Sequence, residues 1–115
     1  MKWRITMLRL YITRHGQTEW NIEGKMQGWA DSPLTENGIE DAKRLSEHLK
    51  DIQFEAIYSS PSGRAYDTAI IAKGNRPLQV IKEGRLKEIN VGIWEGQIIE
   101  ELKQNDNGEF KAFWE

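Results

Sequence analysis

Apolar residues gather in short runs along the first two thirds of the chain, and polar or glycine-containing segments separate the runs. Residues 7–13 form a run rich in apolar and β-branched side chains, which predicts a buried strand. Shorter runs at 54–58 and 78–81 predict two further strands.

Helical patterns lie between these predicted strands. Thr35 is the predicted N-cap of a first helix, because apolar residues follow at spacings of three and four: Ile39, Ala42, Leu45 and Leu49. Ser60 as N-cap and Pro61 at the first helical position predict a second helix that Gly74 would end. Strands alternating with helices indicate an α/β fold, a parallel βαβ sheet with flanking helices.

The remaining segments are less regular. Residues 16–33 predict a loop held by its own aromatic side chains, and residues 88–96 predict a glycine-punctuated loop before a helix at 97–103. The last residues carry three aromatics with no later element to cover them: Phe110, Phe113 and Trp114. We therefore expect an exposed apolar patch, an open sheet edge and self-association through them.

Composition narrows the function classes. With 115 residues, 38% hydrophobic and 30% charged, the chain is expected to form one domain over 1–115, with 1–6 as an N-terminal extension. A net charge of −2 argues against nucleic-acid binding. The chain has no cysteine and no apolar run near the roughly 20 residues of a membrane span, so we expect a cytoplasmic protein without membrane contact.

Candidate chemistry follows the predicted strands. In open α/β sheets, ligands bind beyond the carboxyl ends of the strands. Arg14 and His15 follow the first predicted strand, Arg64 lies shortly after the second, and Glu88 lies in the loop after the third. A helix start with an arginine one turn in suits an oxyanion, and phosphate matches the guanidinium fork.

Three motifs at these positions resemble those of the histidine phosphatase superfamily, which includes the cofactor-dependent phosphoglycerate mutases. The motifs are residues 14–21 (RHGQTEWN), Ser59-Ser60-Pro61 with Arg64-Ala65 and Thr68-Ala69, and Glu88 with Gly92 and Trp94-Glu95-Gly96. Their order and spacing cover residues 8 to about 115. The resemblance implies a phosphoglycerate mutase-like fold whose C-terminal part is missing.

The resemblance also implies roles for individual residues. His15 would attack phosphorus to give a phosphohistidine. Gly16 would let the backbone approach the phosphoryl oxygens, and Arg14 and Arg64 would clamp them. Glu88 would protonate the leaving alcohol and then take a proton from water.

By the same resemblance, Asn21, Gln27 and Gly28 would line the entrance and contact phosphate or substrate. The implied reaction uses no metal and no cofactor, and its substrate would be a small phosphorylated metabolite.

Two departures from the family pattern stand out. The family completes its phosphate pocket with a second histidine on a later strand, and this chain ends before that point. His48 is expected instead as a solvated residue in the last turn of its helix. Ser62-Gly63 stands where family members often carry a leucine, so Gly63 is expected to loosen Arg64.

Three functions stay open from the sequence. The first is a phosphomonoester phosphatase acting through His15, favoured because Ile89-Asn90-Val91 follows Glu88 where mutases more typically have a basic or aromatic residue. The second is a phosphoglycerate-mutase-type phosphotransferase. The third is a catalytically impaired fragment that only binds phosphate or a partner.

Overall fold

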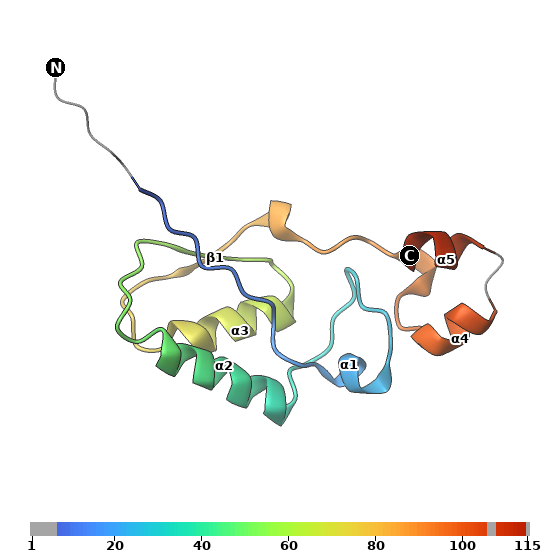
Figure 1. Ribbon diagram of the computed structural model, residues 1–115, viewed down its shortest axis with the longest axis horizontal. Coiled ribbons are helices and arrows are strands. Elements are labelled where there is room, and N and C mark those ends of the chain that lie inside the picture. The colour runs from blue at the N-terminus through green and yellow to red at the C-terminus, as the bar shows by residue number, and fades with distance from the viewer. Residues whose placement is uncertain (1–6, 106–107, 115) are drawn as a thin grey trace, which may run out of the picture.

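A computed structural model describes residues 7–105 and 108–114 of the chain (Figure 1). The predicted extension, residues 1–6, lies outside the described residues. The elements are α1 (Glu19–Glu23), α2 (Glu36–His48), β1 (Ile57–Ser59), α3 (Gly63–Lys73), β2 (Val80–Lys82), the 3₁₀ turns η1 (Gly84–Leu86) and η2 (Gly92–Trp94), α4 (Ile99–Gln104) and α5 (Glu109–Trp114).

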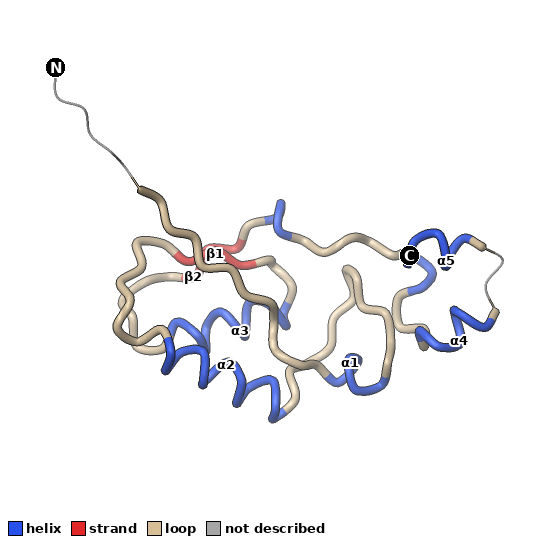
Figure 2. Tube along the Cα trace, viewed as in Figure 1, coloured by secondary structure: helices blue, strands red, loops and turns tan. Residues whose placement is uncertain are grey.

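A βαβ unit organises the middle of the chain. β1 and β2 pair in parallel, with Ile57 opposite Val80 and Ser59 opposite Lys82, and α3 makes the crossover between them (Figure 2). α2 packs along α3. The predicted α/β class is confirmed, with strands shifted by a few residues from the apolar runs.

α2 forms as the apolar spacing predicts. Thr35 caps the helix, and its hydroxyl accepts a hydrogen bond from the backbone N–H of Gly38 at 3.1 Å. Ala42 is buried on the apolar face against α3. The helix ends at His48, which is exposed in the last turn as predicted.

The prediction of a buried strand over residues 7–13 is wrong for this chain. The segment has no strand, and its side chains face solvent: Leu8 is 82% exposed and Ile12 is 90% exposed. Tyr11 is half-covered by an edge-on contact with Phe54, with ring centroids 5.2 Å apart. An apolar run shows that a segment favours burial, but a strand also needs a neighbouring strand and a covering layer.

The start of α3 also differs from prediction. The helix begins at Gly63 with Ser62 as N-cap, two residues later than Ser60 and Pro61 predict. The Ser60 hydroxyl accepts from the N–H of Ser62 at 3.3 Å and so closes a turn before the helix. Ser62 makes no side-chain capping bond.

The aromatic residues near the end of the chain form a cluster rather than a bare patch. Phe110 is buried, and its ring meets Trp94 edge-on with centroids 5.1 Å apart. Phe113 and Trp114 remain partly exposed. The expectation that Phe110 is exposed is wrong, because α5 folds back over the η2 turn, which carries Trp94.

The loop expected to rely on its own aromatics is held mainly by polar groups. It contains the short helix α1, and Trp29 is exposed. Its buried residues are instead Thr18, Met26, Gln27, Gly28 and Ser32, of which three carry polar side chains. No helix within the described ranges is long and apolar enough to cross a bilayer.

Candidate active site

His15 lies half-buried in the turn that follows the extended segment 7–13. Its Nδ1 lies 2.6 Å from the backbone oxygen of Gly16. A carbonyl oxygen can only accept, so this contact assigns the ring proton of the neutral imidazole to Nδ1. Nε2 then carries the lone pair and is the nitrogen able to act as a nucleophile.

The turn is tied to α3 through a threonine. The N–H of Gly16 donates to the hydroxyl of Thr68 at 2.9 Å, and that hydroxyl donates to the carbonyl oxygen of Arg64 at 2.7 Å. The turn also presses on α2, where a Cβ at position 16 would stand 2.6 Å from the backbone oxygen of Gly38. Gly16 is therefore required by the close approach of this turn to the backbone of α2.

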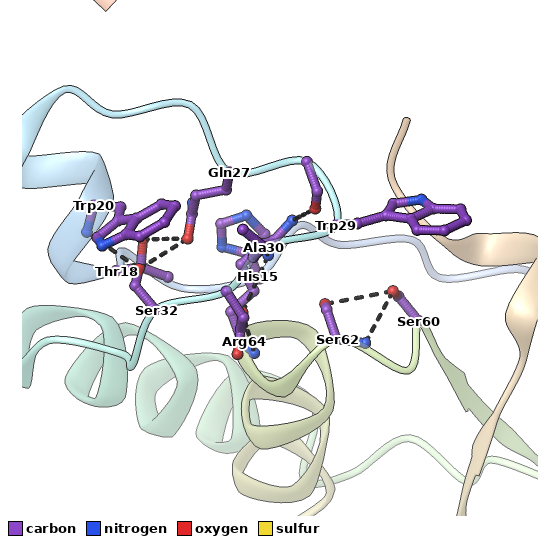
Figure 3. A network of polar contacts seen from close by, with 12 residues as sticks. His15, Thr18, Trp20, Gln27, Trp29, Ala30, Ser32, Ser60, Ser62 and Arg64 are labelled. Atoms are coloured by element: carbon purple, nitrogen blue, oxygen red, sulfur yellow. Dashed lines mark hydrogen bonds and ion pairs between the residues drawn. The ribbon is translucent and has the colours of Figure 1, made fainter. Parts of the chain in front are cut away.

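Arg64 is 3% exposed, and the loop before α2 surrounds its guanidinium (Figure 3). Nη1 donates to the carbonyl of Ala30 at 2.7 Å and to Asp31 Oδ1 at 3.1 Å, and Nη2 donates to the carbonyl of Gly28 at 2.7 Å. Nε is buried without a partner among the described residues. Of the five guanidinium N–H groups, these three bonds leave the Nε–H and one Nη2–H unused, so the predicted phosphate clamp would have fewer donors than a whole fork.

Asp31 makes the capping hydrogen bond at the start of α3 that Ser62 does not make. Its Oδ1 accepts from the backbone N–H of Arg64 at 3.2 Å as well as from the guanidinium. A Cβ at Gly63 would stand 2.4 Å from Asp31 Oδ2, so the glycine makes room for the carboxylate. The glycine therefore admits the anion that holds Arg64, and the expectation that Gly63 loosens Arg64 stays a prediction.

Gly28 joins this loop to the segment that carries Glu88. Its φ is 60°, and a Cβ there would meet Ile89 O and a methyl of Val91, both at 2.8 Å. The N–H of Trp29 donates to Glu95 Oε1 at 2.9 Å. Gly28 is thus a packing position, and Glu95 holds the backbone of the neighbouring Trp29.

Glu88 is exposed, and its carboxylate accepts from the N–H of Ile89 at 2.9 Å. Its backbone oxygen accepts from the indole of Trp29 at 2.7 Å, and in Figure 3 that indole points away from His15. No contact joins Glu88 to His15 in the described part of the chain. The structure brings Glu88 to the neighbouring loop and leaves its carboxylate in solvent.

The turn before Glu88 is anchored to β1. The N–H of Glu83 donates to the carbonyl of Ser59 at 2.8 Å, and the Glu83 side chain accepts from the N–H of Arg85. Side-chain hydrogen bonds from Arg85 hold the pKa of Glu83 below its ordinary value.

Asn21 and Gln27 are both engaged in the loop. The side-chain oxygen of Asn21 accepts from the N–H of Thr18 at 2.9 Å and completes a capping box for α1. Gln27 is buried, and its Oε1 accepts from the hydroxyls of Thr18 and Ser32. In both side chains the oxygen is hydrogen-bonded, and the amide NH₂ group makes no hydrogen bond with the described residues.

Arg14 is exposed, and its side chain makes no hydrogen bond or ion pair with any residue in the described ranges. It lines a hollow of about 290 Å³ together with Thr13, His15, Gly16, Gln17, Asp41, Ala42, Leu45 and Thr68. Arg14 is free to meet an anion beside His15.

Within residues 7–105 and 108–114, no three acidic or histidine side chains gather closely enough to hold a metal ion. His48 lies at the end of α2 remote in sequence from the His15 turn, and its exposure fits a solvated residue.

The sequence profile of the histidine phosphatase superfamily (branch 1) matches residues 10–115. The chain belongs to the histidine phosphatase superfamily. The superfamily members that it resembles are named as phosphatases or as phosphoglycerate mutases.

Phosphoserine phosphatase 1 of Hydrogenobacter thermophilus is 38% identical over 109 residues, which are 95% of this chain and 52% of that protein. A probable phosphoglycerate mutase, GpmB of Proteus mirabilis, is 41% identical over 87% of this chain and 46% of its own length. The solved structure of Bacillus stearothermophilus YhfR superposes with a TM-score of 0.84 at 50% identity, covering 89% of this chain and 50% of that one. The chain therefore spans about half the length of these superfamily members.

Among the predicted site residues of this histidine phosphatase chain, the structure places His15 beside Arg64 (Figure 3). Arg14 lines a hollow together with His15 and Gly16, and Arg64 is not among the residues that border this hollow. Their chemical roles stay predictions. Asp31, Thr18 and Ser32 are residues that the sequence analysis did not single out. Asp31 meets Arg64 across 33 positions, so no local periodicity marks the pair.

Proposed function

We propose that the chain carries the nucleophile of a phosphomonoester phosphatase, with His15 forming a phosphohistidine at Nε2. The observation that supports this most is the contact of His15 Nδ1 with the Gly16 carbonyl, which leaves the Nε2 lone pair free. His15 and Arg14 line one hollow, and Arg14 has no partner within the described part of the chain. A free Nε2 and a cation at the same hollow suit attack on an anionic phosphate.

The reaction would proceed in two displacements. The Nε2 lone pair forms a bond to phosphorus while the phosphorus–oxygen ester bond breaks, and Glu88 gives its proton to the departing alcohol oxygen. Glu88 then takes a proton from water, whose oxygen bonds to phosphorus as the phosphorus–nitrogen bond breaks. Inorganic phosphate leaves, and His15 returns to its neutral form.

The charge of the transferring group would be met by donors that the structure leaves available. Among the described residues, Arg14 has no hydrogen-bond or ion-pair partner, Arg64 Nε makes no hydrogen bond, and the amide NH₂ group of Gln27 makes none. The glycine at 16 keeps the backbone clear of a side chain at the same place. A small phosphorylated metabolite is the proposed substrate, since the relatives described above are named for phosphoserine and phosphoglycerate chemistry. The proposed location is the cytoplasm.

The test is covalent labelling of the purified chain with a generic aryl phosphate. We expect a burst of released phenol and an acid-labile phosphoryl adduct on intact mass, both abolished by His15→Ala. His48→Ala is the matched control, because it removes the other histidine of the chain from an exposed helix end. A folded wild-type chain with neither burst nor adduct would overturn the proposal.

A mutase-type phosphotransferase is the second candidate, favoured by the similarity to the probable phosphoglycerate mutase. Incubation with 3-phosphoglycerate separates the two: release of inorganic phosphate supports the phosphatase, and isomerisation without release supports the mutase.

Turnover by this chain alone is proposed to be slow. The Glu88 carboxylate is exposed and contacts only its own loop among the described residues. A positioned general acid typically contributes about 10²- to 10⁴-fold to the rate, and a carboxylate left in solvent away from His15 forgoes part of that contribution. A labelled His15 with little steady-state release would mark a chain competent for the first displacement only.

We also propose that the chain self-associates. Two apolar regions are available for it: the exposed segment 7–12, and Phe113 with Trp114 on α5. Phe110, buried against Trp94, does not contribute to the second region.

A further inference from the structure

Three polar side chains are buried together beside the His15 turn. Thr18 is 0% exposed, Ser32 is 5% exposed and Gln27 is 9% exposed, in a loop where apolar residues would be the usual choice. Burial of a polar group is costly unless its hydrogen bonds are made. The bonds within this group therefore decide how each member is oriented.

Each hydroxyl is already used once as an acceptor. Thr18 Oγ1 accepts from the backbone N–H of Asn21 at 3.2 Å, and Ser32 Oγ accepts from the backbone N–H of Trp20 at 3.1 Å. Each hydroxyl then has a single proton with which to donate a hydrogen bond. Both hydroxyls donate to the same atom, Gln27 Oε1, Thr18 Oγ1 at 3.1 Å and Ser32 Oγ at 2.8 Å.

This arrangement fixes which way the Gln27 amide faces. With the amide turned over, its NH₂ group would donate to the two hydroxyls, and two buried hydroxyl protons would be left without an acceptor. An unsatisfied buried donor is more costly than an average hydrogen bond is stabilising. The oxygen of Gln27 is thus directed to Thr18 and Ser32, and Nε2 makes no hydrogen bond with the described residues.

The Gln27 amide lies beside the predicted nucleophile, so its orientation bears on the site. Figure 3 shows the Gln27 oxygen facing Thr18 and Ser32, with the His15 imidazole beside Gln27. Thr18 follows His15 by only three residues, and Arg64 holds the carbonyls of Gly28 and Ala30, which directly follow Gln27 along the loop.

We propose that Thr18 and Ser32 are positioning residues that hold the Gln27 amide with its NH₂ donor, and not its oxygen, toward the phosphoryl group at His15. The inference rests on the proposed function, because it takes the phosphoryl group as the ligand of that donor. Through this orientation, Thr18 and Ser32 make the site selective for an anion. An anion meets the N–H groups of Gln27 at this point, whereas a reversed amide would present a repelling oxygen.

The binding test uses inorganic phosphate and orthovanadate as probes, titrated into the purified chain by calorimetry. Thr18→Val and Ser32→Ala are expected to weaken binding about tenfold, a loss typical of a hydrogen bond to a charged group. Thr18→Ser, which keeps the hydroxyl, is expected to bind as the wild type does. Gln27→Glu places a carboxylate oxygen where the NH₂ group stood and is expected to lose binding altogether.

Thr18 also caps α1, so a matched control separates lost stability from lost orientation. Val80→Ala removes two buried carbons in β2, away from the His15 turn, with an expected cost of about 1–2 kcal/mol in stability. Its phosphate affinity is expected to stay at the wild-type value. Equal weakening of phosphate binding by Val80→Ala and Thr18→Val would overturn the inference.

A second readout follows the amide itself. Phosphate is expected to move the NMR signal of the Gln27 NH₂ group in the wild type and leave it unmoved in a Thr18→Val/Ser32→Ala double variant. In the free protein, Thr18→Val is expected to shift the Gln27 Cδ resonance, because Oε1 loses a donor. An unchanged Cδ resonance overturns the inference, whereas absence of phosphate binding by every form, wild type included, overturns the proposed function.

Discussion

At the scale of single residues, Arg64 is the centre of the site's organisation. Its guanidinium donates three hydrogen bonds to the loop at 28–31 and so holds that loop against α3. Asp31 is the charged partner, and its side chain is 38% exposed while Arg64 is buried. A buried cation that loses its anion keeps its desolvation cost, so the pair matters more to folding than a surface ion pair would.

We therefore expect Asp31→Asn to lower the free energy of unfolding by about 2 kcal/mol, with solvent screening at Asp31 keeping the loss below that of a fully buried pair. Chemical denaturation followed by tryptophan fluorescence measures it. Asp41→Asn is the matched control: its ion pair with Arg44 is exposed on both sides, and its expected effect is within about 0.5 kcal/mol. Equal effects of the two substitutions would contradict the role given to Asp31.

At the scale of elements, the His15 turn sits directly on the first turn of α2. A Cβ at Gly38 would stand 2.2 Å from the carbonyl oxygen of Gln17, and the reciprocal position at Gly16 is nearly as close to Gly38. The Thr35 hydroxyl adds a hydrogen bond to Gln17 Oε1 at 2.9 Å. Two glycines and a cap therefore bring a loop and a helix to backbone contact, which places His15.

Gly38→Ala tests this contact, because two effects of opposite sign compete. Alanine is the better helix former by about 1 kcal/mol, whereas overpacking against Gln17 costs about 1–3 kcal/mol. We expect the clash to win, since its partner is backbone, and thermal unfolding should show a lower midpoint.

Asn37→Ala, one position earlier on the exposed face of α2, carries the helix-propensity gain alone. It is expected to leave stability unchanged or slightly raised. A Gly38→Ala variant more stable than the wild type would refute the close packing.

At the scale of the whole molecule, the chain buries little apolar surface. Among the residues that the structure describes, the buried hydrophobic ones are Met26, Ala42, Val80 and Phe110. Its radius of gyration is 17.6 Å, against roughly 13 Å for a compact domain of 100 residues. Superfamily members of about twice the length have more chain with which to cover such surface. The exposed side chains of residues 7–12 are consistent with that difference.

Self-association is the prediction at this scale. Light scattering over a concentration series should show growing mass for the wild type, since large exposed apolar patches favour association. Leu8→Lys/Ile12→Lys and Phe113→Lys/Trp114→Lys tell which region is responsible, and Ile22→Lys on α1 is a control for added charge at another exposed apolar position. Monodisperse monomers at high concentration would contradict the prediction.

Local signals were enough to predict several elements. Thr35 and the spacing of Ile39, Ala42 and Leu45 predict α2, and the parallel β1–α3–β2 unit follows from alternating apolar runs. His15 stands out because it follows an apolar run and Arg64 because it follows β1, and both stand out by resemblance to a family, for which the sequence is enough. These features depend on residues close in sequence or on motifs of known spacing.

The chain's sequence by itself determined the α/β class, the main helices and the superfamily. Tertiary structure alone decided three things: the exposure of segment 7–13, the capture of Arg64 by Asp31 across 33 positions, and the shared acceptor of Thr18 and Ser32. The physical reason is that propensity and periodicity act between neighbours, whereas burial and the satisfaction of buried polar groups depend on segments that meet only after folding.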